Sequence, residues 1–354
     1  MNRTAETETD SAFRLLDDGD EIVPGRRDKA MKFKVLRDVL RRDRLLGVLA
    51  LLLFAGLCVY SLANAVAGDF LEALRALDPR VVLLAVGTQL LSYVARAARL
   101  AQCESAIGWR RLPLALRLVL IHNASNLLLP MRSGELSFPW LMQRWFGVDP
   151  LQAGGTLLFL RALDVQVLAV LAALAAMLAG AVAPPSDAAF GILMLAALSG
   201  PLLLLLLARR MPSRLRSIRI LQRLVQGIPD CRRTFCGSLL WTWLAWSLKL
   251  TGLAVLFAAL AKVSVPTGVL AALGGDASTV LPIHAPGGAG TYEAGALALL
   301  APWMTITPQV VSAIIGLHVF VLGLAVLLGA TATFGHGRGM APPQSRAPAP
   351  VTKD

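Results

Sequence analysis

Charged residues are scarce in this chain of 354 residues, where they make up only 16% of the total. A globular domain usually carries about 25% charged residues, so the composition excludes an ordinary soluble fold. Residues 45–67 and 188–208 contain no Asp, Glu, Lys or Arg, and residues 294–337 carry no formal charge. A run of about 20 apolar residues spans the hydrocarbon core of a bilayer. The sequence therefore predicts an all-α polytopic membrane protein.

Other patterns are also missing. Strands of a membrane β-barrel would give segments of about 10 residues with alternating polarity, and none is present. The first 21 residues hold seven acidic residues and no apolar core, which is unlike a secretory signal peptide. The four cysteines show neither a disulfide framework nor metal-ligand spacing. No catalytic triad stands out either, so we expect no metal, no cofactor and no enzyme.

The basic residues are unevenly distributed along the chain, whose formal net charge is +12. Nine lie between Arg26 and Arg44, and eight arginines lie between Arg209 and Arg233. A further cluster comprises Arg96, Arg99, Arg110 and Arg111. Such clusters separated by loops poor in Lys and Arg indicate cytoplasmic segments beside anionic lipid headgroups. We therefore expect cytoplasmic termini, lipids as partners, and no nucleic acid.

Six complete spans are predicted, at about 45–66, 80–97, 151–182, 188–208, 236–262 and 308–333. An acidic and then basic segment, 1–44, precedes the membrane domain, 45–335. A basic cytoplasmic loop, 209–235, interrupts this domain, and a disordered Pro-rich tail, 336–354, follows it.

Two stretches of apolar sequence read as copies of one another. The first runs from Pro130 through Glu135 to Pro150 and Arg161, and the second from Pro286 through Glu293 to Pro308 and His318. In each copy a Pro follows the Glu by 15 residues, and a polar residue follows it by 26 or 25. Because Pro and Gly interrupt helices, we expect broken, re-entrant hairpins at about 112–145 and 265–303. The repeats, about 80–182 and 236–333, would be inverted relative to each other, as in transporters.

Ionisable residues inside these segments are costly unless they pair or face water. Arg161 and Asp164 are three residues apart, so they can pair on one helix face for structural or functional reasons. Ser133 and Thr291 are predicted as helix N-caps, each two residues before a Glu. These glutamates could simply complement the helix dipole. Alternatively, the two helix starts could bind a lipid phosphate together with Arg132 and Arg161.

Several other polar residues have two interpretations. Asn123 and Asn126 could face the substrate or only tie helices together, and His122 lies nearby. His284, near the second break, is either structural or a proton carrier. Lys249 is either an internal partner of Asp276 or close enough to a helix end to snorkel. A membrane transferase would use the carboxylates of this set, which are Glu135, Asp164, Asp276 and Glu293.

Three motifs together resemble the lysylphosphatidylglycerol synthase transmembrane family. They are Asn-x6-Pro-x-Arg-x-Gly-Glu from Asn123 to Glu135, the Arg161/Asp164 pair, and Pro-x3-Pro-Gly-Gly-x-Gly-x-x-Glu from Pro282 to Glu293. The resemblance covers about 40–335 and implies a lipid-translocating bundle with paired half-helices. The implied site residues are Asn123, Arg132, Gly134, Glu135, Pro286, Gly287, Gly288, Gly290 and Glu293.

The chain departs from the family pattern at three positions. His318 stands where the family usually has Arg, so the charge there would depend on pH. Ala289 stands in place of Leu, and Tyr292 in place of a common Arg, so the headgroup could differ. The soluble domain that performs lysyl transfer in longer members is not expected here.

We therefore predict a lipid or glycolipid translocase of the bacterial inner membrane, acting on an anionic or glycosylated headgroup. The alternatives are a non-catalytic accessory subunit of a lipid, hopanoid or cell-envelope pathway, or a membrane-embedded transferase. The sequence leaves open whether the protein binds a partner protein of lipid biosynthesis and whether it forms a homo-oligomer. The predicted substrate-binding residues are Asn123, Asn126, Arg132, Ser133, Gly134, Glu135, Arg161, Asp164, Gly287, Gly288, Gly290, Thr291, Glu293 and His318.

Overall fold

The computed structural model describes residues 77–178, 218–279 and 285–334, with residues 75, 195, 198–203, 206 and 210. These residues all belong to one compact unit, Leu49–Asp354. They form helices and connecting turns, and none of them forms a strand, which confirms the all-α prediction. The predicted span 45–66, most of the predicted span 188–208, and both terminal segments lie outside the described residues.

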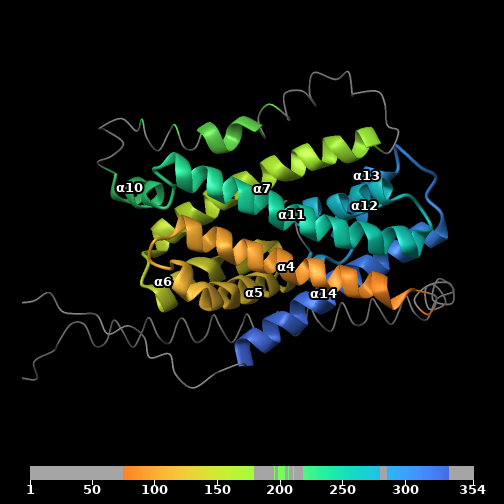
Figure 1. Ribbon diagram of the computed structural model, residues 1–354, viewed down its shortest axis with the longest axis horizontal. Helices are drawn as coiled ribbons and strands as arrows, with labels where there is room; N and C mark the ends of the chain where they lie inside the picture. The colour runs from red at the N-terminus through yellow and green to blue at the C-terminus, as the bar shows by residue number, and fades with distance from the viewer. Residues whose placement is uncertain are drawn as a thin grey trace, which may run out of the picture. The chain divides into compact units, whose positions relative to one another are not determined.

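The described helices are labelled in Figure 1 by their order along the chain. They are α4 (Pro79–Cys103), α5 (Leu112–Leu128), α6 (Ser137–Phe146), α7 (Pro150–Leu178), α10 (Arg219–Gln226), α11 (Arg232–Ala261), α12 (Val265–Ser278), α13 (Thr291–Leu300) and α14 (Pro308–Phe334), with 3-10 helices η1 (Trp109–Arg111), η2 (Pro130–Leu136) and η3 (Pro286–Gly288). Four of them, α4, α7, α11 and α14, are long and apolar enough to cross a membrane. They correspond to four of the six predicted spans.

Both predicted breaks are present. Helix α5 ends at Leu128, and the backbone of Leu129 is extended, with φ −86° and ψ 137°. Pro130 explains this end, because a proline disfavours helical geometry in the residue before it and donates no hydrogen bond. The second break separates α12 from α13 and contains η3, where Gly287 has φ 66°. Glycine adopts such a left-handed conformation without a steric penalty.

The two broken hairpins lie at different ends of the helical bundle. In Figure 1, α5 and α6 lie toward the end where α10 lies, whereas α12 and α13 lie toward the opposite end. The 3-10 helices at the two breaks, η2 and η3, are nevertheless in contact. The tips of the two hairpins are therefore in contact with each other.

Helices α4 and α11 pack against each other in antiparallel directions. Near one end, Gly252 of α11 lies directly against Ala85 and Thr88 of α4. Near the other end, Cys103 Sγ lies 3.0 Å from Ser238 Oγ. Small residues let membrane helices approach closely. The closely packed pair of α4 and α11 can therefore hold polar side chains in fixed positions.

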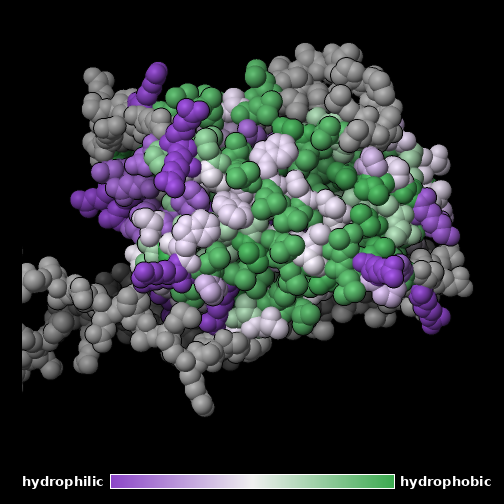
Figure 2. Space-filling model, viewed as in Figure 1, coloured by the Kyte–Doolittle hydropathy of each residue, from purple (hydrophilic) through white to green (hydrophobic). Residues whose placement is uncertain are grey.

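Large apolar side chains cover the outside of the described helices. Leu83 of α4 is 70% exposed, and Leu240 of α11 is 68% exposed. Figure 2 shows hydrophobic residues over the middle of this face and hydrophilic residues concentrated near its ends. An apolar band between polar ends is expected for a protein whose solvent is the bilayer. The chain is therefore a multi-pass membrane protein.

Candidate functional site

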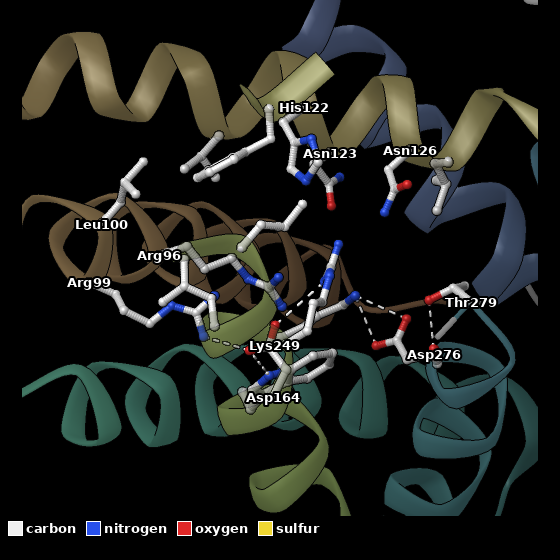
Figure 3. A pocket seen from close by; sticks show the side chains of 17 residues that line it. Arg96, Arg99, Leu100, His122, Asn123, Asn126, Asp164, Lys249, Asp276 and Thr279 are labelled. Carbon is white, nitrogen blue, oxygen red and sulfur yellow. Dashed lines mark hydrogen bonds and ion pairs between the residues drawn. The ribbon is translucent and has the colours of Figure 1, made fainter. Parts of the chain in front are cut away.

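A polar cavity lies among α4, α5, α7, α11 and α12, with a volume of about 90 Å³. One buried water needs roughly 10–15 Å³ by the same measure, so the space suits several waters or a phosphate-sized group. Figure 3 shows its charged and amide side chains pointing inward from different helices. The polar or aromatic residues that line it include Arg96, Arg99, His122, Asn123, Asn126, Arg161, Asp164, Trp246, Lys249, Asp276 and Thr279.

Asp164 of α7 is the centre of one ionic cluster. Its Oδ1 accepts hydrogen bonds from Arg99 Nη1 at 2.6 Å and from Trp246 Nε1 at 2.9 Å. Its Oδ2 lies 3.5 Å from Arg161 Nη1, which confirms that this i, i+3 pair forms directly. Asp164 is only 2% exposed and Arg99 only 5%. Buried charges of this kind are tolerated because each has an opposite charge in contact.

Lys249 of α11 and Asp276 of α12 form a second ion pair. The Lys249 Nζ atom lies 2.9 Å from Asp276 Oδ1 and 2.8 Å from Oδ2. The lysine is therefore an internal partner of Asp276, and the snorkelling alternative is wrong. The ammonium group also lies 5.3 Å from the centroid of the Trp246 ring.

Arg96 of α4 lines the cavity without a carboxylate partner. Its guanidinium lies 4.7 Å from the centroid of the Trp246 ring. It has no ion pair or hydrogen bond with any residue that the structure describes, and its Nε is buried without a partner there. Arg96 is of intermediate exposure, and a partly buried charge without an ion pair costs free energy, so this arginine is a candidate for contact with a ligand.

The sequence interpretation of Arg96 and Arg99 was wrong. It grouped them with Arg110 and Arg111 in one basic cluster beside anionic lipid headgroups. Helix α4 instead continues to Cys103, and both arginines line the cavity. The available signal was their spacing, since residues three apart share one helix face.

The glutamate of each break pairs with the polar residue that follows it in the sequence. Glu135 Oε1 accepts from Arg161 Nε at 3.1 Å, over 26 residues. Glu293 Oε1 lies 2.6 Å from His318 Nδ1, over 25 residues. Both contacts therefore join a broken hairpin to the long helix that follows it. The interpretation that a glutamate fixes an arginine is confirmed for Glu135 and Arg161.

Both ring nitrogens of His318 in α14 contact the second break. His318 Nε2 lies 2.8 Å from the carbonyl oxygen of Gly287, which can only accept, so Nε2 carries a hydrogen. The contact between Nδ1 and Glu293 Oε1 then contains one further proton, on either the imidazole or the carboxyl group. Tyr292 stacks on His318 with the ring centroids 4.5 Å apart. This cluster is buried, since His318 is 2% exposed.

The predicted N-caps are wrong at both breaks. Ser133 lies inside η2, and Leu136 precedes α6 without a side-chain cap. The N-cap of α13 is Gly290, whose backbone N–H donates to Glu293 Oε2 at 2.8 Å, while Thr291 Oγ1 donates to the carbonyl oxygen of Gly288. Because Ser133 lies within the 3-10 helix η2, no helix begins at Ser133 and its side chain does not cap one. The glutamate in the first turn of α13 does complement that helix start, as one interpretation held.

The glycines of the second motif are explained by the backbone. Gly287, Gly288 and Gly290 have φ of 66°, 75° and 76°, values that other residues rarely adopt. Gly134 of the first motif has a different role, since an added Cβ there would overlap the backbone of Ser125 and Asn126 in α5. It is therefore required for close packing of η2 on α5.

The two asparagines both line the cavity, as their spacing predicts. Asn123 Nδ2 donates to the hydroxyl of Tyr93 in α4 at 3.0 Å, so this amide does tie two helices together. The side-chain oxygen of Asn126 is buried and has no hydrogen-bond partner among the described residues. His122 Nδ1 lies 3.0 Å from Ser137 Oγ, which joins α5 to α6. The side chain of Arg132, and all of His284, lie outside what the structure describes.

These features define a helical multi-pass membrane protein in which two broken hairpins meet beside a charged cavity. The chain belongs to the family described as the lysylphosphatidylglycerol synthase TM region, which matches residues 47–329. The resemblance noted in the sequence is thereby confirmed, and it places the chain among membrane proteins of lipid-related pathways. No curated protein and no solved structure matches the chain.

Substitution of Gly134 tests the close contact between the first break and α5. We expect Gly134→Ala to destabilise the protein by about 1–3 kcal/mol, because η2 and α5 must separate to admit the methyl group. Gly87→Ala in α4 is the matched control, since nothing lies within 4 Å of its added Cβ. Thermal unfolding in detergent would compare the two variants, and equal melting temperatures would contradict the packing role.

Proposed function

We propose that this protein is a lipid or glycolipid translocase of the bacterial inner membrane, with both termini in the cytoplasm. The observation that carries the proposal is a charged cavity beside the meeting point of two broken hairpins that lie toward opposite ends of the bundle. Broken helices around a buried polar site are a feature of secondary transporters. The uneven distribution of basic residues supports the cytoplasmic position of the termini.

In the proposed mechanism, the headgroup and the acyl chains of one lipid occupy different environments. The headgroup occupies the cavity, where cationic and amide groups replace its hydration, while the chains remain in the bilayer against the apolar outer surface. This division avoids the cost of moving a bare polar headgroup through hydrocarbon. The small cavity volume is adequate because only the polar group must be enclosed.

The two hairpins provide candidate gates. A side-chain ion pair links each hairpin to the next long helix, Glu135 with Arg161 and Glu293 with His318. The side chains of Glu135 and Arg161 are 28% and 24% exposed, so this pair can exchange protein partners for water or headgroup. In the proposed cycle, one contact opens while the other stays closed, giving access to one leaflet at a time.

A transferase has less support from the same residues. Its candidate carboxylates, Glu135, Asp164, Asp276 and Glu293, are all paired with cationic or histidine side chains. A carboxylate engaged in this way is poorly available as a general base. The accessory-subunit alternative makes a different prediction, which is tolerance of substitutions in the cavity.

Reconstitution in vesicles tests the translocase directly. With fluorescent lipids carrying anionic or glycosylated headgroups, we expect the protein to accelerate exchange between leaflets. Glu135→Gln should slow this exchange about tenfold or more, because a hydrogen bond to a charged group contributes roughly 1.5–3 kcal/mol. Dithionite quenching of the outer leaflet measures the rate.

Arg144→Gln is the control for this assay, because Arg144 is exposed on α6 and, among the described residues, stacks only on Trp140. It should leave the exchange rate unchanged. Absence of movement for every anionic and glycosylated lipid would contradict a translocase. Undiminished movement in Glu135→Gln would contradict the gating role of this pair.

A further inference from the structure

The turn at the second break is closed by the side chains of Glu293 and His318. His318 Nε2 donates to the carbonyl oxygen of Gly287 at 2.8 Å. The backbone N–H of Gly290 donates to Glu293 Oε2 at 2.8 Å. Between these two contacts, Glu293 Oε1 lies 2.6 Å from His318 Nδ1. The two ends of the turn 287–290 are therefore held together through the contact between these side chains.

This contact requires a proton between Glu293 and His318. The hydrogen on His318 Nε2 is engaged by Gly287, so without a further proton Nδ1 presents only a lone pair. A lone pair 2.6 Å from a carboxylate oxygen places two acceptors against each other, and no hydrogen bond can form. A second proton would neutralise Glu293 but would still leave a donor between the two atoms. Loss of the shared proton is therefore the step that breaks the contact.

Other titratable groups on the elements packed against α14 have contacts of their own or are exposed. Those with described contacts are Arg117 with the carbonyl oxygen of Ala332, His122 with Ser137, and Lys249 with Asp276. Those exposed near the ends of α11 are Arg232, Arg233, Cys236 and Lys262. Tyr292 and Glu293 of α13 contact the His318 ring directly. The side chain of Glu293 is 18% exposed and that of His318 only 2%, so the shared proton exchanges with the surroundings through the carboxyl group.

Tyr292 connects this pair to the central cavity. Its ring stacks on His318 with 4.5 Å between the ring centroids, and a Cβ added at Gly275 of α12 would overlap the same ring. The next residue, Asp276, lines the cavity and pairs with Lys249. The hydroxyl of Tyr292 is buried and has no hydrogen-bond partner among the described residues, so packing holds the ring in place there. A displacement of His318 is therefore transmitted through Tyr292 to a wall of the cavity.

We infer that a proton controls the second hairpin, and that Glu293 and His318 form the binding site of this proton. The inference rests on the proposed function, in which this hairpin is one of two gates, and it names a second ligand of the transport cycle. Opening of the hairpin releases the shared proton, and closing takes one up again. Release of one proton changes the equilibrium between closed and open forms by at most about tenfold per pH unit. Because the open form holds fewer protons, a higher pH favours it.

Hydrogen–deuterium exchange of the full-length protein in detergent tests this inference without any lipid substrate. Mass spectrometry follows the peptide that covers 285–293 from about pH 6 to about pH 9, the range in which a histidine pair can titrate. Division by the exchange rates of the same peptide in unfolded protein removes the intrinsic effect of pH. We expect the protection of this peptide to fall by up to about tenfold per pH unit.

Two variants remove the exchangeable proton in different ways. In Glu293→Gln, the amide N–H donates to Nδ1 of neutral His318. In His318→Arg, the guanidinium keeps its proton at every pH used and can still donate to Glu293. The protection of 285–293 should no longer change with pH in either variant. Because the two variants alter different residues, a folding defect in one leaves the other to decide the question.

Glu104→Gln is the matched control, because it also removes a buried carboxyl group, but between α4 and α7. Glu104 is 4% exposed and accepts a hydrogen bond from Thr156 Oγ1 at 2.6 Å. This variant should leave the pH dependence of 285–293 as it is in the unaltered protein. It separates a local effect at the second break from a general effect of losing a buried carboxyl group.

Protection of 285–293 that does not change with pH in the unaltered protein would overturn the inference. An equal pH dependence in Glu293→Gln and His318→Arg would do the same. Lipid exchange in vesicles at the same pH values separates this result from the proposed function. Opening that depends on pH and on this pair, without lipid movement, would support the proton site and remove the translocase. Lipid movement at a rate that neither pH nor Glu293→Gln alters would support the translocase and overturn the inference.

Discussion

Asp164→Asn is expected to lower the free energy of unfolding by about 3–5 kcal/mol, because it breaks a buried ion pair from one side. The substitution preserves the size of the side chain, so no cavity is created. It leaves Arg99, which is 5% exposed, without its carboxylate at 2.6 Å. Arg161 would still contact Glu135, so the cost should come mainly from Arg99.

Titration of the unfolding transition with SDS in mixed micelles measures this effect. Arg223→Gln is the control, because Arg223 pairs with Asp149 where the two side chains are 46% and 33% exposed. Exposed pairs contribute about 0–1 kcal/mol. The double variant Arg99→Gln/Asp164→Asn should lose less than the sum of the single variants, since the two residues are in contact. A loss below about 1 kcal/mol in Asp164→Asn would contradict its role as the counter-charge of Arg99.

Lys249→Met is expected to be about as damaging, at roughly 3–5 kcal/mol, because Asp276 would remain buried without a cation. Asp276 is 2% exposed, and its carboxylate lies 2.8 Å from Lys249 Nζ. The double variant Lys249→Met/Asp276→Asn removes both charges, so it should recover most of the lost stability.

Lys262→Met is the control for this experiment, since Lys262 follows the last residue of α11 and is exposed. It should change the free energy of unfolding by less than about 0.5 kcal/mol. The same SDS titration measures all three variants. A double variant that is no more stable than Lys249→Met would show that the ion pair is not the reason for the loss.

The boundaries of the hairpins were predictable because they depend on neighbouring residues alone. A proline fixes its own φ and restricts the residue before it, so the end of α5 before Pro130 follows from two positions. The contact between Arg161 and Asp164 was predictable for a similar reason, since residues three apart in a helix lie on one face. The predicted helix cap at Ser133 was wrong. The sequence did not reveal the 3-10 geometry of η2, because this geometry depends on the packing of η2 against α5.

By itself, the sequence determined the helical membrane class, four of the described long helices, the two breaks and the family, because hydropathy and Pro/Gly effects act over short distances along the chain. Only the tertiary structure decided which cations are neutralised. Arg96, Trp246 and Asp276 come from three helices, and their meeting depends on how α4, α11 and α12 rotate and pack. Local sequence does not encode those rotations, so the absence of an ion pair at Arg96 among the described residues became visible only in three dimensions.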